Sequence, residues 1–269
     1  MHPSLVAPVL TPRRVIDQLT VKPSLAYALR RVCQGYTGPC MDVRRSSDGV
    51  VVPIGFDITG ELDIGALIAH VGANDGTVAK WYDQMGSTNH MTQGVGAQPR
   101  IVASGVLDKC NGRPAIYQNT GSLGYLSVTY ASGNSYAISY SAQWLSDING
   151  RILHDPTLPV LFGWQAGVYT RGYFANGFNY QQSNQDTNPH VQSVRVVSNS
   201  IASGFRDGTA ISQDNVVAAS AWSGFNTNGH VAGTPSECRF MELYVFGASA
   251  NDSDLKILDT NQKQRFGVA

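Results

Sequence analysis

The residue types best suited to chemistry gather between Trp81 and Gln93, where two aromatics, an acid, amides, a glycine and a histidine follow one another. Asp83 offers a carboxylate for acid–base chemistry or ligand contact, and His90 offers an imidazole for catalysis or ligation. A strand end that runs into Gly and Asn also suits a structural role, because acidic and amide side chains commonly satisfy loop amides. We expect the structural role to prevail and keep Asp83 and His90 as candidate ligand contacts.

A second group suited to binding lies between residues 144 and 190, which are rich in aromatic and amide side chains. Aromatic faces stack on the apolar faces of sugars, and amides hydrogen-bond sugar hydroxyls. Tyr and Trp are also enriched at protein interfaces. The alternative is that strand alternation turns many of these aromatics into a core. The candidate binding residues of this region are Trp164, Tyr173, Asn176 and Tyr180.

The sequence contains no pattern typical of a metal site or of a catalytic nucleophile. The histidines from His70 to His230 lack ligand spacing, and neither an Asp-x-Asp-x-Asp calcium loop nor a Gly-x-Ser-x-Gly elbow is present. No CxxC pair suggests thiolate zinc. We expect no metal and no cofactor.

The cysteines leave two alternatives open. Their even number, four, is compatible with two disulfides. Cys33 and Cys40 flank a turn with two glycines and a proline, so a local bridge between them is sterically reasonable. The other reading is four reduced, partly buried thiols.

Composition narrows the class of protein. The 269 residues include 28 Gly and 12 Tyr, which favours β-sheet, and 14% charged residues, below the usual value of about 25%. With zero formal net charge, no basic field attracts nucleic acid or anionic lipid, so we exclude both as partners. No apolar run reaches the length of about 18 residues needed to span a membrane, and the N-terminus does not resemble a secretory signal.

The elements that must position these residues are mostly strands. Many short strand patterns follow one another from residue 77 to residue 248, which predicts an all-β sandwich of two antiparallel sheets. Asp48-Gly49 and Asp207-Gly208 predict hairpin turns. Helical spacing predicts short helices over residues 24–32 and 63–70, and a closing helix over residues 252–265.

The first 23 residues differ from the rest. Pro3, Pro8 and Pro12 and the scarcity of periodic apolar residues predict an extended N-terminal arm. Such an arm could dock on a neighbouring subunit or lie on its own domain. Residues 24–269 show neither a repeat nor a low-complexity linker, so we expect one domain preceded by the arm.

Several motifs, taken in order, resemble one family. They are Ala26–Arg31, Tyr36–Pro39, Val43–Asp48, Trp81–Gln93, Gln98–Val102, Asn111–Ile116, Met241–Phe246 and Gln264–Val268. The chain from residue 24 to residue 268 resembles the concanavalin A-like (LamG, jelly-roll) domains related to the catalytic domain of α-L-arabinofuranosidase B. Relatives of this kind occur in tail, fibre and other virion-surface proteins of tailed bacteriophages. The resemblance implies two facing antiparallel sheets with a concave, sugar-binding face.

The catalytic groups that this resemblance implies are missing from the matching positions. A retaining glycosidase needs two carboxyl groups about 5–5.5 Å apart. The family nucleophile is a Glu in a central strand, but residues 160–180 contain no acid. The family acid/base Asp lies in a Gly-Gly-Asp-Asn-Ser-Asn-Gly loop, and the best match, Ser223–Gly229, has Phe225 there. Glu237 and Glu242 remain, either facing solvent or paired with Arg239. We expect no catalytic residue and no enzyme.

These observations predict a non-catalytic structural protein of a tailed-phage virion: a capsid decoration, collar or tail appendage that binds host glycans. We expect a homo-oligomer, located in the virion, that contacts other virion proteins through residues 1–23 and cell-surface glycan through the sandwich. The alternatives are a glycoside hydrolase of the arabinofuranosidase type and a soluble lectin.

Overall fold

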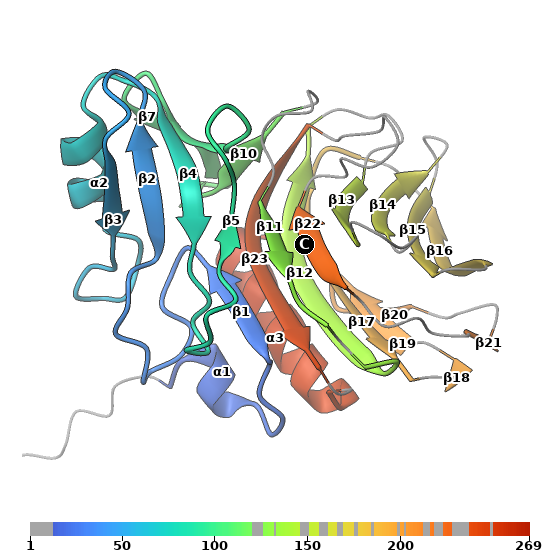
Figure 1. Ribbon diagram of the computed structural model, residues 1–269. Coiled ribbons are helices and arrows are strands. Elements are labelled where there is room, and N and C mark those ends of the chain that lie inside the picture. Colours follow the sequence, from blue (N-terminus) through green and yellow to red (C-terminus); the bar gives the residue numbers. More distant parts are fainter. Residues whose placement is uncertain are drawn as a thin grey trace, which may run out of the picture.

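The computed structural model describes residues 13–119, 126–131, 133–145, 151–155, 161–165, 169–174, 177–183, 186–197, 200–201, 203–211, 216–217, 223–227, 237–247 and 250–269. Its strands pair antiparallel and fold over one another as a two-layered sandwich, which confirms the predicted fold class (Figure 1).

The first layer, which we call the front sheet, has the strand order β3-β2-β4-β5-β11-β22-β13-β14-β15-β16. Its strands are β2 (Met41–Arg45), β3 (Val51–Ile54), β4 (Gly76–Trp81), β5 (Met91–Thr92), β11 (Ser127–Thr129), β13 (Arg151–His154), β14 (Leu161–Gln165), β15 (Tyr169–Phe174), β16 (Gly177–Ser183) and β22 (Gly224–Thr227). The predicted hairpin at Asp48-Gly49 is confirmed, since it joins β2 to β3.

The second layer, which we call the back sheet, is built around β23. One edge of β23 pairs with β12, and the other edge pairs with β1 and β10. Beyond β12 come β17, β19 and β20. Its strands are β1 (Leu25–Ala28), β10 (Ile116–Gln118), β12 (Tyr136–Trp144), β17 (Pro189–Val196), β19 (Ser203–Arg206), β20 (Thr209–Ile211) and β23 (Cys238–Phe246).

The two sheets are joined through β6 (Arg100–Ala103), which pairs with β4 on one side and β10 on the other. Strand β7 (Val106–Leu107) extends β6. Two small ribbons complete the described strands: β8 (Lys109–Cys110) with β9 (Arg113–Pro114), and β18 (Ser200–Ile201) with β21 (Val216–Val217). The predicted turn at Asp207-Gly208 is confirmed between β19 and β20, with φ values of 51° and 83°.

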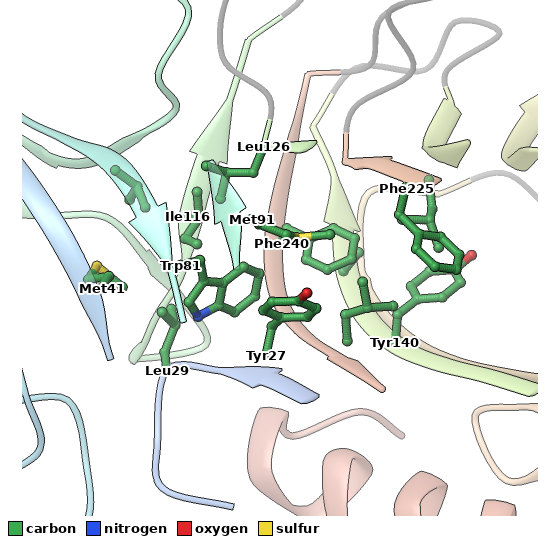
Figure 2. Packing of buried hydrophobic residues seen from close by; sticks show 14 of the residues in the cluster. Tyr27, Leu29, Met41, Trp81, Met91, Ile116, Leu126, Tyr140, Phe225 and Phe240 are labelled. Atoms are coloured by element: carbon green, nitrogen blue, oxygen red, sulfur yellow. The ribbon is translucent and has the colours of Figure 1, made fainter. Parts of the chain in front are cut away.

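Aromatic side chains fill the space between the sheets (Figure 2). Trp81 on the front sheet meets Tyr27 and Phe240 on the back sheet, with ring centroids 5.7 and 6.2 Å apart. Phe240 also stacks on Tyr140 at 6.1 Å. These rings are fully buried, so the core fixes the relative position of the two sheets.

Three helices are described. Helix α2 (Ile64–Val71) confirms the prediction for residues 63–70; Asp63 is its N-cap and Gly72 its C-cap. Helix α3 (Asp252–Phe266) confirms the closing helix, with an Asn251 cap and a left-handed Gly267. Helix α1 (Val15–Gln18) is a single turn. None of them is long and apolar enough to cross a membrane.

The helix predicted over residues 24–32 is wrong, because Leu25–Ala28 forms strand β1. Both faces of this strand are buried. Leu25 and Tyr27 lie in the core between the sheets, while Ala26 and Ala28 lie under the helices on the outer side of β23. A short apolar run buried on both faces carries neither helical nor strand periodicity, so its spacing cannot tell the two apart.

The part of the arm within the described residues lies on its own domain. Val15 and Ile16 are buried in the cluster that also contains Leu255 and Leu258 of α3. The amides of Thr20 and Val21 donate to the Asp254 carboxylate at 2.8 and 2.9 Å. Residues 1–12 of the predicted arm lie outside the described residues.

The possible bridge between Cys33 and Cys40 is not formed, and all four cysteines are free thiols. The two residues belong to different layers of the core. Cys40 lies between the sheets, with its Sγ 3.4 Å from the Ala28 carbonyl oxygen. Cys33 packs on the outer cluster beneath α3. Cys33 and Cys40 are only seven positions apart in the sequence, but their side chains pack on opposite faces of β1.

A buried acid on α3 carries an electrostatic cost. Asp259 is 1% exposed, and among the described residues neither of its carboxylate oxygens has a hydrogen bond of ordinary geometry. Burial raises its pKa to about 6, assisted by the Asp207 charge and opposed by the Gly208 amide, Lys263 and Lys256. Above this pH the ionised carboxylate is held in a poorly solvated position.

Replacing Asp259 by asparagine should therefore stabilise the protein by about 1–2 kcal/mol at neutral pH, after discounting for solvent screening. Because the folded pKa lies above the unfolded value of 3.8, the folded state binds more protons between pH 4 and 6. Wild-type stability then falls as pH rises through that window, and the variant loses this slope. Urea unfolding at pH 4, 5 and 7 measures both effects; equal stabilities at pH 7 would refute the assignment.

Candidate ligand-binding face

Asp83 is a structural acid. Its side chain is fully buried, and its oxygens accept hydrogen bonds from the Ala26 amide at 2.8 Å, the Met85 and Ser87 amides at 3.1 Å and the Ser87 hydroxyl at 2.7 Å. It thus ties strand β1 to the loop after β4. No face of the carboxylate is open to solvent, so Asp83 is removed from the candidate ligand contacts.

His90 lies at the outer end of the same loop. Its Nδ1 accepts from the Asp83 amide at 3.2 Å, and its ring packs against Tyr82 with centroids 4.6 Å apart. Burial, followed by the charge of Lys80, lowers the pKa of His90. The imidazole is therefore neutral at pH 7, with Nδ1 as acceptor and Nε2 carrying the proton. His90 remains a candidate contact beside the outer face of the front sheet.

The outer face of the front sheet carries a row of polar residues in cross-strand register. Asp42 on β2 pairs with Lys80 on β4, and Lys80 pairs with Thr92 on β5. Thr92 pairs in turn with Ser127 on β11. The strand neighbours of these residues point into the core, so the row itself faces outward.

The row continues over two more strands. Ser127 pairs with Asn226 on β22, and Asn226 pairs with His154 on β13. We call this set the polar row: Asp42, Lys80, Thr92, Ser127, Asn226 and His154. Across six strands spaced about 4.8 Å apart it extends for about 24 Å, the length of an oligosaccharide rather than a single sugar.

The first half of the polar row is open. Thr92 is exposed, and Lys80 retains 35% of its side-chain exposure. Its ammonium group lies 3.5 Å from the Asp42 carboxylate and 5.1 Å from the centre of the Tyr82 ring. The Tyr82 hydroxyl donates to Asp42 at 3.0 Å, and burial together with the Asp42 charge raises its pKa. Donors, acceptors and an aromatic edge are thus held in place.

The second half of the polar row is covered. Asn226 is 8% exposed and His154 is 2% exposed. The Nδ1 of His154 lies 2.9 Å from the Asp155 carbonyl oxygen, and the Asp155 carboxylate accepts from the Ser223 amide and hydroxyl at 2.6 and 2.8 Å. These contacts fix the end of β13 against the start of β22, so the accessible part of the row runs from Asp42 to Ser127.

The aromatic candidates of the sequence fall on the next three strands. Trp164 lies on β14, Tyr173 on β15 and Tyr180 on β16. The backbone register runs from His154 to Leu161 and then to Tyr173, so Tyr173 lies in line with the polar row. The side chains of these strands, and the whole of Asn176, lie outside the described residues.

Phe225, which the sequence resemblance matched to the acid/base position, faces inward. It is fully buried in the core between the sheets (Figure 2). Its ring stacks on Tyr130, with centroids 5.9 Å apart. Its neighbour Asn226 belongs to the polar row on the opposite face of the sheet. A phenyl ring turned into the core performs no proton transfer on the outer face.

The two glutamates of the last strand region are engaged elsewhere. Glu242 is 1% exposed and pairs with Arg30 at 2.6 Å, not with Arg239, which corrects the sequence prediction. Arg239 instead donates to Gln143 at 3.0 Å. Glu237 accepts from the Tyr117 hydroxyl at 2.7 Å. Among the described residues, Asp42 is the carboxylate that the strand registers place in the polar row.

Metal binding has no support in the part of the chain described: no group of three or more His, Cys, Asp or Glu side chains there could hold an ion. The groups of the polar row are hydroxyl, amide, imidazole, carboxylate and ammonium. Such groups exchange hydrogen bonds with polyhydroxylated ligands without needing a cofactor.

Comparisons with known proteins show the fold. No family model and no curated protein matches the chain. It is similar to a GH54 α-L-arabinofuranosidase soaked with a cyclic sulfate inhibitor, with 14% identity, a TM-score of 0.67 and coverage of 89% of this chain and 62% of that chain. It is also similar to an arabinofuranosidase complexed with arabinofuranosyl-α-1,2-xylobiose, with 12% identity and a TM-score of 0.68. That match covers 92% of this chain and 63% of the arabinofuranosidase chain. The chain thus spans less than two thirds of either enzyme, and the shared feature is the β-sandwich.

Proposed function

We propose that this protein is a non-catalytic carbohydrate-binding sandwich whose glycan lies across the outer face of the front sheet. The observation that carries the proposal is the polar row, which brings residues from distant parts of the sequence into one line. Its accessible groups are those that hydrogen-bond sugar hydroxyls, and Tyr82 and His90 supply flat faces beside it. The similarity in fold to arabinofuranosidases is consistent with a sugar ligand.

The absence of catalysis is part of the proposal. Displacement at a sugar carbon requires two carboxyl groups on either side of the scissile bond. Among the described residues the polar row contributes Asp42 alone, and Asp42 already binds the Tyr82 hydroxyl and the Lys80 ammonium. Asp83 and Glu242 are buried in structural contacts. The face can therefore hold a glycan without the pair of groups needed to cleave it.

We further propose that the protein acts on the surface of a tailed-phage virion, where binding to a cell-surface glycan would serve attachment. The support for this location is the resemblance of the motifs from Ala26 to Val268 to phage surface domains. Purified particles probed with an antibody against the chain provide the test. Its presence at stoichiometric amounts is expected, and its absence from particles would reject the location while leaving glycan binding open.

Replacing Thr92 by arginine should block the glycan. Thr92 is exposed at the centre of the accessible row, so a long charged side chain covers its neighbours without disturbing the core. We expect affinity for the best glycan on an array to fall at least about tenfold, equivalent to about 1.4 kcal/mol. Calorimetric titration measures the change. Thr209→Arg makes the same substitution at an exposed strand position of the back sheet and should leave affinity unchanged.

The hydrolase alternative makes a different prediction for Asp42. If the protein cleaves glycans, it should release the chromophore from an aryl arabinofuranoside, and Asp42→Asn should abolish that release. Our proposal expects no release above the uncatalysed rate from either protein, while the wild type still binds glycan. Sugar release that depends on Asp42 would replace the proposal with the enzyme.

A further inference from the structure

His190 of β17 bridges two carboxylates. Its Nδ1 lies 2.6 Å from a carboxylate oxygen of Asp207, and its Nε2 lies 2.9 Å from a carboxylate oxygen of Asp186. Asp207 belongs to the turn between β19 and β20, whereas Asp186 lies on the segment between β16 and β17. His190 pairs with Ala142, whose side chain lies in the core between the sheets. The bridge is therefore on the inner side of the back sheet, away from the polar row.

Both ring nitrogens must carry protons in this bridge. An ionised carboxylate only accepts hydrogen bonds, and a neutral imidazole has a proton on one nitrogen alone. The contacts with Asp186 and Asp207 together thus require the imidazolium form. Burial raises the pKa of Asp186, but the Asn188 amide, His190 and Arg206 together hold it below its ordinary value. Asp186 is therefore ionised and able to accept.

A second partner for Nε2 is already in place. A guanidinium nitrogen of Arg206 on β19 lies 3.1 Å from this atom. Because a guanidinium only donates, this contact is a hydrogen bond only when Nε2 has no proton. Nε2 thus has one partner for each protonation state, Asp186 when it is protonated and Arg206 when it is bare. In the bare state, the nitrogen lone pair faces the Asp186 carboxylate and repels it.

The Nδ1 side of the bridge is fixed. The other carboxylate oxygen of Asp207 accepts from the Val191 amide at 2.8 Å, and the Asp207 amide donates to the Val191 carbonyl oxygen at 3.0 Å. Lys263 of α3 donates to the Asp207 carbonyl oxygen at 2.5 Å. Asp207 is thereby held against Nδ1 in both states. Loss of a proton is directed to Nε2, whose partner Asp186 retains 36% of its side-chain exposure.

The other groups near His190 lie on β12 and α3. On β12, the Trp144 ring lies 6.4 Å from the imidazole and does not titrate, and burial raises the pKa of Tyr140 far above its ordinary value. On α3, which packs on the outer side of the back sheet, the Asp259 carboxyl interacts with the charge of Asp207. Asp259 is therefore the group whose titration an experiment must separate from that of His190.

We propose that His190 is a proton-operated switch on the segment that leads from the front sheet into the back sheet. With Nε2 protonated, His190 holds Asp186 and fastens this segment to the turn between β19 and β20. With Nε2 bare, His190 holds Arg206 and releases Asp186. The segment follows β16, which lies with β14 and β15 at one end of the front sheet, so its release loosens the attachment of these strands to the back sheet.

Nuclear magnetic resonance of the isotopically labelled full-length chain tests the switch between pH 5 and pH 8, where histidine side chains generally change charge. The ring nitrogen signals of His190 should show that Nε2 loses its proton while Nδ1 keeps it. Backbone order parameters of residues 186–188 should fall over the same pH step, from the rigid value of about 0.85 towards about 0.6.

Three variants assign this step. Asp186→Ala removes the carboxylate that Nε2 holds, so residues 186–188 should be mobile at every pH and show no step. Asp259→Asn removes the other group that titrates in this range and should keep the step. His70→Gln, which alters a histidine of α2 bound to the Val43 carbonyl oxygen, should keep it as well. Circular dichroism melting establishes that each variant is folded.

Four results would overturn the proposal. They are a His190 ring that keeps one protonation state across the range, loss of the proton from Nδ1, equal mobility of residues 186–188 at both ends of the range, and a step that survives in Asp186→Ala. A step that disappears in Asp259→Asn would assign the pH response to α3 and reject the switch at His190.

Discussion

Replacing Asp83 by alanine should destabilise the protein by about 3–5 kcal/mol, since each buried donor left without a partner costs about 1–3 kcal/mol. The substitution strands the amides of Ala26, Met85 and Ser87, which now donate to the carboxylate. The Ala26 amide has no other route to solvent because β1 is buried on both faces. Such a loss is a large share of a typical total stability of about 5–15 kcal/mol.

Urea unfolding of Asp83→Ala measures the loss of stability. The Asp83→Asn variant is measured in the same way and should show a smaller loss. Asparagine keeps one accepting oxygen and replaces the other with a donor, so it should lose part of the stability and not all. The exposed turn residue Asp48 supplies a control, because its replacement by alanine breaks a surface pair with Arg45 and one exposed hydrogen bond from the Val50 amide. A change below about 1 kcal/mol for Asp83→Ala would contradict the structural role.

Replacing Glu242 by alanine is the second large effect expected. Glu242 accepts two hydrogen bonds from Arg30, at 2.6 and 3.2 Å, and one from the Tyr244 hydroxyl at 2.9 Å. Arg30 also donates to Asn261 on α3. Removing the carboxylate leaves the largely buried guanidinium, whose side chain is 15% exposed, without this counter-charge, which typically costs about 3–5 kcal/mol. Urea unfolding is preferred here because guanidinium salts screen ion pairs.

A paired substitution separates loss of the charge from loss of packing. Arg30→Met together with Glu242→Leu removes both charges and keeps apolar volume, so it should recover most of the stability lost in Glu242→Ala. If the double variant is as unstable as the single one, or if Glu242→Ala is neutral, the buried pair does not hold β23 against α3. In either case the corrected role of Glu242 would be wrong.

The elements with local signals could be predicted from the sequence. Asp63 and Asn251 are N-caps that precede periodic apolar residues, and Gly72 and Gly267 end their helices with positive φ. The two Asp-Gly turns are local signals as well, because the Asp-Gly dipeptide favours the backbone angles of a tight hairpin turn. Strand β1 carries no such local signal. It is specified by its pairing with β23, over 200 residues later in the chain, and by what covers its two faces.

The candidate site was much harder to predict. The position of Asp83 at a strand end before a Gly- and Asn-containing loop predicted that its carboxylate would bind backbone amides. It accepts hydrogen bonds from the amides of Ala26 and Ser87. The polar row gives no comparable signal, because Lys80, Ser127 and Asn226 become neighbours only through the order of the strands. The pairing of Glu242 with Arg30, 212 positions away, is hidden for the same reason. The aromatic candidates between residues 144 and 190 were chosen by residue type alone, and residue type does not indicate which face of a sheet a side chain lies on.

The most direct test of the central claim is to map where a glycan binds. With the wild-type chain isotopically labelled and titrated with the tightest glycan from an array, backbone amide shifts should change along Asp42, Lys80, Thr92 and Ser127. The amides of α3 and β20 should not move, and the sugar should be recovered uncleaved. Shifts confined to another surface, or a cleaved sugar, would contradict a non-catalytic glycan-binding face on the front sheet.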